Sequence, residues 1–83
     1  MATVSLSTLR TGAEALVTDL LPPRRPSDSA LLLRLMEIGF LPGERVRVIA
    51  RAQPGGEPIA VRLGNATFAL RRFEADLVHV EWT

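Results

Sequence analysis

The sequence predicts a mainly β fold: a small closed barrel of five short strands, with one α-helix inserted after the first strand. Three observations support this prediction. Short segments alternate apolar and polar residues, as half-buried strands do. Turns rich in glycine, proline and asparagine separate these segments at short intervals. Only residues 30–38 carry an apolar stripe at helical spacing. A closed barrel would remove the exposed edges that an open sheet of five strands leaves.

The composition fits a single domain over residues 1–83. A chain of this length buries only about 60–65% of the surface that its unfolded form exposes, so we expect one modest core. The absence of cysteine excludes disulfides, thiolate metal sites and a cysteine nucleophile. Ten arginines stand against nine acidic residues, for a net charge of +1. Since binding to nucleic acid needs a clustered positive face, this balance argues against it.

The sequence shows no membrane or targeting segment. No apolar run approaches the ~20 residues that a spanning helix needs. The first residues, MATVSL, lack the charged start and apolar stretch of a signal peptide. We therefore expect a cytoplasmic protein.

The first elements are a short lead-in and a strand. Residues 1–12 contain Leu6 and Leu9, whose spacing suits one helical turn under the core. Residues 14–20 alternate apolar and polar side chains and predict the first strand.

A loop rich in proline and arginine follows this strand. Residues 21–27 contain three prolines within five positions, which exclude a helix there and break any strand ladder. We expect the helix to cover residues 30–38, with Ser27 or Asp28 as its cap. The role of the loop at 22–26 stays open.

The helix is expected to bury one stripe and to end abruptly. The buried stripe is predicted to comprise Leu31, Leu35 and Ile38, widened by Leu32 and Met36. Leu33 lies outside the stripe. Gly39 should end the helix in a left-handed conformation, and Pro42-Gly43 fits the central pair of a type II turn.

The second half of the chain is predicted to be strands joined by tight turns. Gly64-Asn65 suits a two-residue hairpin with glycine at its first central position. Between the last two strands, residues 71–76 break the alternation and predict one helical turn. The expected strands are residues 44–52, 59–63, 66–70 and 77–82.

The ordered residues also carry a family resemblance. The segment RLMEIGFLPGERVRV is preceded by LRTGAEALVTDL and followed by PIAVRLGNATFALRRFEADLVHVE. Together they resemble the FeoA family, ferrous iron transport protein A, over residues 6–81. The strongest marks are Arg34-Leu35, Gly39 and Pro42-Gly43 at their mutual spacing.

This resemblance implies an SH3-like β-barrel, a fold that the family shares with a domain of iron-dependent repressors. It implies a cytoplasmic accessory protein of bacterial ferrous iron uptake. The implied partner is the cytoplasmic GTP-binding region of the FeoB permease, so the chain would meet the membrane only through that partner. The oligomeric state is left open.

A docking face is predicted at the helix and the turn after it. We expect Leu33 and one of Phe40 or Leu41 to be exposed, because the helix already supplies five apolar residues to the core. Exposed apolar groups beside charged ones mark interaction sites. Leu33, Phe40 and Leu41 would then contact the partner, with Arg34 and Glu37 at the rim, while the structural turn formed by Gly39, Pro42 and Gly43 holds them in place. The alternative is that Phe40 and Leu41 close one end of the barrel.

The sequence offers no catalytic, metal or cofactor site. It has one histidine and no glycine-rich phosphate cradle, so we expect a non-enzymatic protein without a cofactor. His79 and Glu81 lie two apart on one strand, but two ligands do not make a metal site. The arginine pairs at 24–25 and 71–72 are expected to be solvated rather than to serve a phosphate. The alternative function is a nucleic-acid-binding or metal-responsive repressor-type module, which the balanced charge disfavours.

Overall fold

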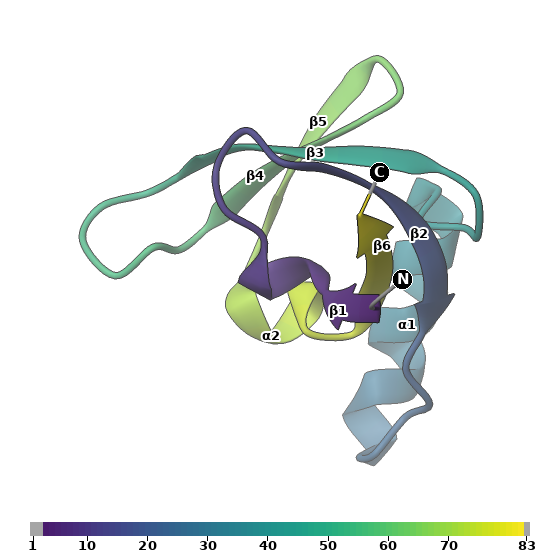
Figure 1. Cartoon of the computed structure of the whole chain (residues 1–83). Helices are drawn as coiled ribbons and strands as arrows, with labels where there is room; N and C mark the ends of the chain where they lie inside the picture. The colour runs from purple at the N-terminus through teal and green to yellow at the C-terminus, as the bar shows by residue number, and fades with distance from the viewer. Residues whose placement is uncertain (1–2, 83) are drawn as a thin grey trace.

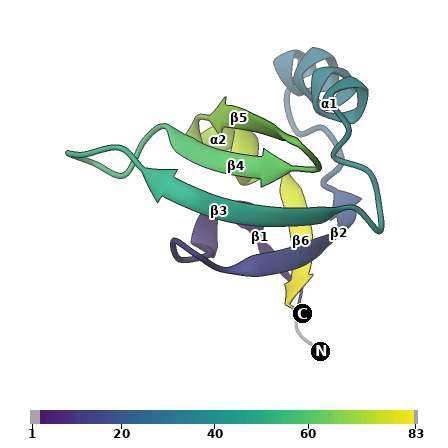
Figure 2. The same ribbon diagram turned by 90° about the horizontal axis from the view of Figure 1, so that it is seen from above.

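The computed structural model describes residues 3–82 and is dominated by one antiparallel sheet. The six strands follow the order β1-β6-β2-β3-β4-β5 in the sheet, and the sheet curls around a core (Figures 1 and 2). In chain order the elements are β1 (Thr3–Ser5), the 3₁₀ helix η1 (Leu6–Thr8), β2 (Glu14–Leu20), α1 (Pro26–Ile38), β3 (Arg45–Arg51), β4 (Ile59–Leu63), β5 (Ala66–Leu70), α2 (Arg72–Ala75) and β6 (Val78–Trp82).

The mainly β class and the helical insertion are as predicted, but the strand count and the closure are not. The lead-in forms a sixth strand, β1, which pairs with β6 from Thr3↔Glu81 to Ser5↔His79. The helix therefore follows the second strand. Within residues 3–82, β1 and β5 do not pair, so hydrogen bonds do not close the barrel and β1 and β5 are the two edge strands.

The core lies inside the curled sheet and follows the predicted alternation. Buried side chains project from every second position of β2, β3, β4 and β6, and Leu6 and Leu9 seal one end. Trp82 lies two positions after Val80 at the end of β6 and is 58% exposed.

Helix α1 begins at Pro26, earlier than predicted. Proline is tolerated in the first helical turn because its missing N–H would have no intrahelical partner there. Asp28 is buried, and its Oδ2 accepts hydrogen bonds from the backbone N–H groups of Arg24 and Arg25 at 3.1 and 3.2 Å. The carboxylate thus satisfies donors just ahead of the helix and favours its positive end.

The Gly64-Asn65 hairpin has the predicted turn. Gly64 has φ +61°, Asn65 does not have a positive φ, and Leu63 pairs directly with Ala66. This combination defines a type II′ turn. Within the described residues, no helix has the length and hydropathy needed to cross a bilayer.

Candidate docking site

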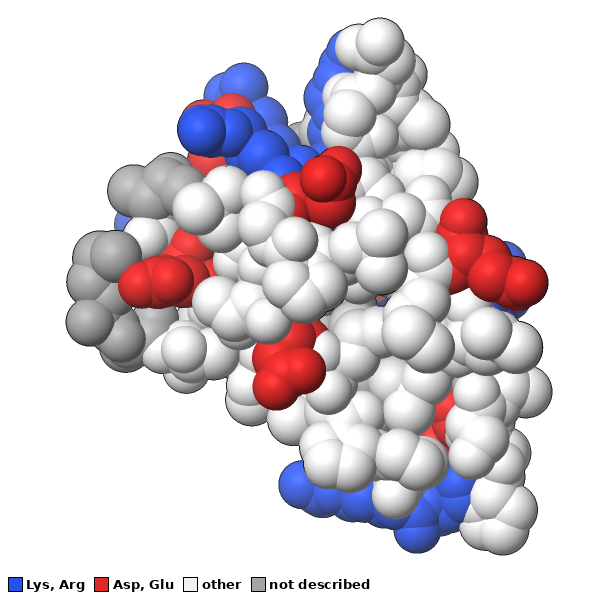
Figure 3. Space-filling view, turned by 90° about the vertical axis from the view of Figure 1, so that its right-hand side faces the viewer, with Lys and Arg blue, Asp and Glu red and all other residues white. Residues whose placement is uncertain are grey.

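A mostly apolar groove lies between α1, the loop that precedes it and the turn that follows it. Its volume is about 360 Å³. We call it the α1 groove. Asp19 is its one charged lining residue; the others are Leu20, Leu21, Pro22, Pro23, Leu32, Met36, Phe40, Leu41 and Pro42. The side of the molecule that carries α1 and β2 is mostly uncharged, with several separate acidic groups on it and arginines at its upper and lower edges (Figure 3).

Three large apolar side chains are exposed in or next to this groove. Met36 and Leu41 line it and are 42% and 46% exposed. Leu33 is 54% exposed and lies three positions before Met36, so the two share one side of α1. The predicted exposure of Leu33 and of one of Phe40 and Leu41 is therefore confirmed, and the exposed one of the two is Leu41. A contiguous apolar surface of this kind is typical of an interaction site.

Phe40 is a correction to the predicted contact residues. It is completely buried, and its ring packs edge-to-face on Phe68 with centroids 6.3 Å apart. It therefore belongs to the core, as the alternative interpretation held for Phe40, whereas Leu41, which that interpretation also placed there, is exposed. A side chain with no accessible surface makes no direct contact with a partner.

The two charged residues predicted for the rim have different environments. The Arg34 guanidinium lies 3.8 Å from the carboxylate of Glu74, which is largely buried. This pair links α1 to α2, so Arg34 also serves the fold. Glu37 is exposed and has no ion pair within residues 3–82.

The turn after α1 has the predicted backbone conformations at Gly39 and at Pro42-Gly43. Gly39 has φ +123°, and the N–H groups of Gly39 and Phe40 donate to the carbonyls of Met36 and Leu35 at 3.1 and 3.0 Å. This pair of bonds is a Schellman motif, which turns the chain inward and buries Phe40. Gly43 has φ +89°, and Glu44 N–H donates to the Leu41 carbonyl at 3.0 Å, as a type II turn requires.

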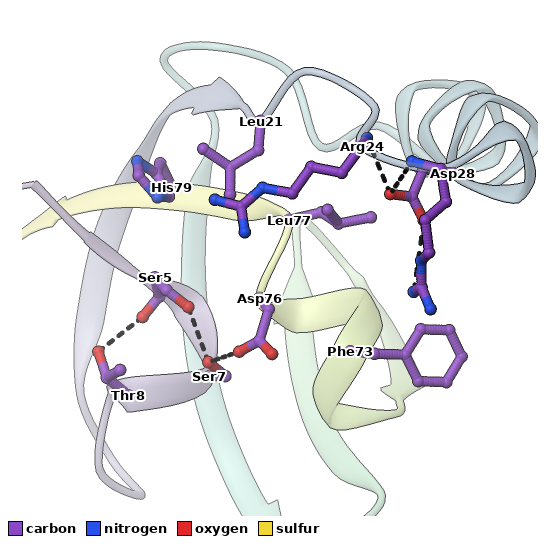
Figure 4. Close-up of a pocket in the computed structure, with 11 residues that line it drawn as sticks. Ser5, Ser7, Thr8, Leu21, Arg24, Asp28, Phe73, Asp76, Leu77 and His79 are labelled. Atoms are coloured by element: carbon purple, nitrogen blue, oxygen red, sulfur yellow. Dashed lines mark hydrogen bonds and ion pairs between the residues drawn. The ribbon is translucent and has the colours of Figure 1, made fainter.

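The proline- and arginine-rich loop separates the α1 groove from a second hollow of about 710 Å³. Pro22 and Pro23 line the groove, while the Arg24 side chain extends across the second hollow between Leu21 and Leu77 (Figure 4). Polar groups of this hollow are already engaged with one another: Ser7 donates to Asp76, and Asp28 accepts from the loop backbone. With two arginines against two aspartates, the hollow has no net charge to attract an ion.

His79 and Glu81 are both half-buried on one face of β6. Among residues 3–82, no group of three or more potential ligands is arranged to hold a metal ion. The pair therefore does not assemble into a larger ligand set.

Sequence reasoning missed the part of the groove that comes from β2 and the loop. Leu20, Leu21 and Pro22 were interpreted as a strand end and a linker, and Met36 as core. The signal was the two adjacent prolines, which keep the chain extended beside the helix. Which helix face they would approach depends on the tertiary arrangement.

Comparisons with known proteins agree with this fold. The FeoA domain model matches residues 4–81. FeoA of Stenotrophomonas maltophilia, solved with zinc and described as an SH3 domain protein, is 40% identical, with 94% of this chain and 89% of that chain covered and a TM-score of 0.83. FeoA of Chlorobium tepidum is 32% identical, with coverage of 95% and 70% and a TM-score of 0.79.

A manganese-dependent transcriptional repressor also matches, at 25% identity and a TM-score of 0.80, with 98% of this chain and 42% of that chain covered. No curated protein matches the chain significantly. The family model spans nearly the whole sequence, and the SH3-like fold of the Stenotrophomonas maltophilia FeoA matches this chain over 89% of that protein's length. The chain belongs to the FeoA domain family.

Proposed function

We propose that this chain is a cytoplasmic accessory protein of ferrous iron uptake that docks on the cytoplasmic GTP-binding region of a FeoB-type permease. As a FeoA-family member it is a non-enzymatic protein. The Stenotrophomonas relative is presented as a candidate activating factor of bacterial ferrous iron transport, and a Clostridium thermocellum relative is named iron(II) transport protein A. These names support a role in ferrous iron uptake, and the α1 groove supports docking on a protein partner as the way the chain acts.

The observation that carries the proposal is the α1 groove with its exposed neighbours Leu33, Met36 and Leu41. Apolar side chains that line a concave surface, with charged residues at its border, have the composition of the centre and rim of a protein interface. We assign Glu37, which is exposed on α1 next to Met36, to this border. Because Gly39 and Gly43 fix the turn, the groove needs little reorganisation on binding, which lowers the entropic cost of docking.

The proposal is tested by measuring binding to the purified cytoplasmic region of the permease by calorimetry. Leu33→Glu and Leu41→Glu each place a charge at the centre of the proposed interface. We expect each to weaken binding at least about tenfold, equivalent to about 1.4 kcal/mol. Ile49→Glu is the matched control: Ile49 is 40% exposed on β3 and does not line the groove.

The variant Phe40→Leu distinguishes a loss of direct contact with the partner from a loss of folding. Phe40 has no exposed surface, so a folded Phe40→Leu protein should bind with nearly unchanged affinity. The proposed face is wrong if both glutamate variants remain folded, by circular dichroism, and bind as tightly as Ile49→Glu.

A further inference from the structure

Two arginines lie directly opposite each other on the outer face of the sheet. Arg47 of β3 and Arg62 of β4 are register partners, and both are exposed. Side chains at opposed positions of an antiparallel pair are close enough to interact, and like charges there are destabilising. This arrangement works against the stability of the sheet.

Neither arginine is neutralised within the described residues. The three ion pairs formed by residues 3–82 do not include Arg47 or Arg62. Glu14 is the cross-strand partner of Arg47 on β2, but its carboxylate pairs with Arg45 at 3.9 Å. Three guanidinium groups beside one carboxylate leave two positive charges at this place.

Open space lies on both sides of the arginine pair. One hollow of about 260 Å³ is lined by Arg47 and Arg62 together with Glu14 and Arg45. A second, of about 290 Å³, is lined by the same two arginines with Ile49. Gly64 borders the first and Gly12 the second, and a Cβ built on either glycine would meet no atom within 4 Å. A small ligand can therefore approach both guanidinium groups.

This place is distinct from the α1 groove. Leu63 is buried and its side chain reaches toward Gly39 at the end of α1. Because successive residues of a strand point to opposite faces, Arg62 points away from that helix. A ligand on Arg47 and Arg62 would lie on the outer face of the sheet and leave the groove accessible.

We propose that Arg47 and Arg62 bind a doubly charged oxyanion of the phosphate monoester class. A guanidinium group presents a planar fork of donors that matches phosphate oxygens, so two opposed forks can hold one phosphate group. A phosphate monoester carries a charge of about −1.5 to −2 at neutral pH. It balances the two positive charges, whereas a single carboxylate leaves one of them.

The test follows the arginine side chains by NMR. The Nε–H signals of a ¹⁵N-labelled protein are recorded during titration with inorganic phosphate at pH 7.5, with the ionic strength held constant by sodium chloride. We expect saturable shifts of the Arg47 and Arg62 signals. Arg47→Gln and Arg62→Gln should each weaken binding at least about tenfold. Arg10→Gln is the matched control, since Arg10 is exposed and lines neither of these hollows.

Thermal unfolding supplies a second readout. Without phosphate, Arg62→Gln should raise the thermal unfolding midpoint because it removes the repulsion between Arg47 and Arg62. Addition of phosphate should raise the midpoint of the intact protein by more than it raises that of the variant. The proposal is overturned if the shifts do not saturate, or if Arg10 responds as strongly as Arg47 and Arg62.

Vesicles of phosphatidylcholine, with and without phosphatidylinositol 4-phosphate, distinguish the source of the phosphate group. Sedimentation with the phosphorylated vesicles that depends on Arg47 and Arg62 would assign the site to a lipid headgroup. Binding of inorganic phosphate alone would assign it to a soluble phosphate ester. Failure of inorganic phosphate to bind would overturn the proposal whichever vesicles the protein sediments with, and it would leave the proposed docking at the α1 groove untouched.

Discussion

The Arg51 side chain links the end of β3 to the segment around η1, which is distant in the sequence. The alternation of β3 predicts that it points to solvent, but it is half-buried, and its Nη2 donates to the carbonyl oxygens of Ser7 and Leu9 at 2.7 and 2.5 Å. These bonds tie the segment around η1 to the end of β3. A charged donor shared by two carbonyls is among the stronger hydrogen-bonding arrangements in proteins.

We therefore expect Arg51→Met to lower the free energy of unfolding by about 1–3 kcal/mol, because it leaves both carbonyls without this donor. Urea denaturation measures the change. Arg10→Met, at an exposed arginine, should change it by less than about 0.5 kcal/mol. Equal effects of the two substitutions would show that the bonds contribute no net stability.

Arg51 and Phe40 escaped prediction at the residue scale for different reasons. The register of β3 against β4 shifts between Val48 and Ala50, so Arg51 lies opposite the buried Ile59 and not on the solvent side that strict alternation predicts. The helical period stops at Gly39, so it says nothing of Phe40, which the Schellman motif turns inward. Leu33 lies well inside α1, and its exposure follows from the period alone.

At the scale of elements, the β4–β5 hairpin allows a sharp test of register. The two-residue turn makes Leu63 and Ala66 a hydrogen-bonded pair, and the bonding alternates from there along the strand. Ala66 therefore directs its N–H toward β4. Ala69 directs its N–H away from β4, toward the open edge of the sheet.

Proline substitution at these two exposed alanines should give unequal results. Ala66→Pro removes a ladder donor and should cost about 1–3 kcal/mol. Ala69→Pro removes a donor that faces the open edge and should cost less than half as much. Chemical denaturation of both variants provides the comparison. If Ala69→Pro is the more damaging of the two, the alternation inferred here for β5 is wrong.

The elements that the sequence predicted well are those whose signal is local. The bounds of β2, β4 and β5, the Gly64-Asn65 turn and the end of α1 follow from alternation and turn chemistry in adjacent residues. The start of α1 was placed too late because Pro26 resembles a helix breaker until it is recognised as a first-turn residue. Strand β1 was missed because its three residues gain their structure from β6, more than seventy positions away.

At the scale of the whole molecule, the two ends of the described chain meet in the sheet. β1 covers one side of β6 and β2 covers the other. The strand order is a property of the entire chain, so patterns within single segments do not contain it. The same holds for the α1 groove, which combines residues from β2, the loop, α1 and the following turn.

This arrangement gives β1 a protective role. Three residues suffice to occupy the backbone donors and acceptors along one side of β6, and Val4 packs partly against the core. Without β1, β6 would become an edge strand of the sheet. Its unpaired backbone N–H and C=O groups would then be a template for pairing with another chain. The protection comes from the backbone of β1 more than from its side chains.

Deletion of residues 1–5 should therefore have two effects. Loss of the β1–β6 ladder and of the Val4 contacts should lower the free energy of unfolding by about 1–3 kcal/mol. The exposed β6 edge should also make the protein associate as its concentration rises, which light scattering coupled to size-exclusion chromatography detects. Thr3→Ala keeps the backbone ladder and should behave like the intact chain in both measurements. A deleted protein with unchanged stability and unchanged mass at every concentration would show that β1 does not protect the edge, and that pairing with β2 suffices to hold β6 in place.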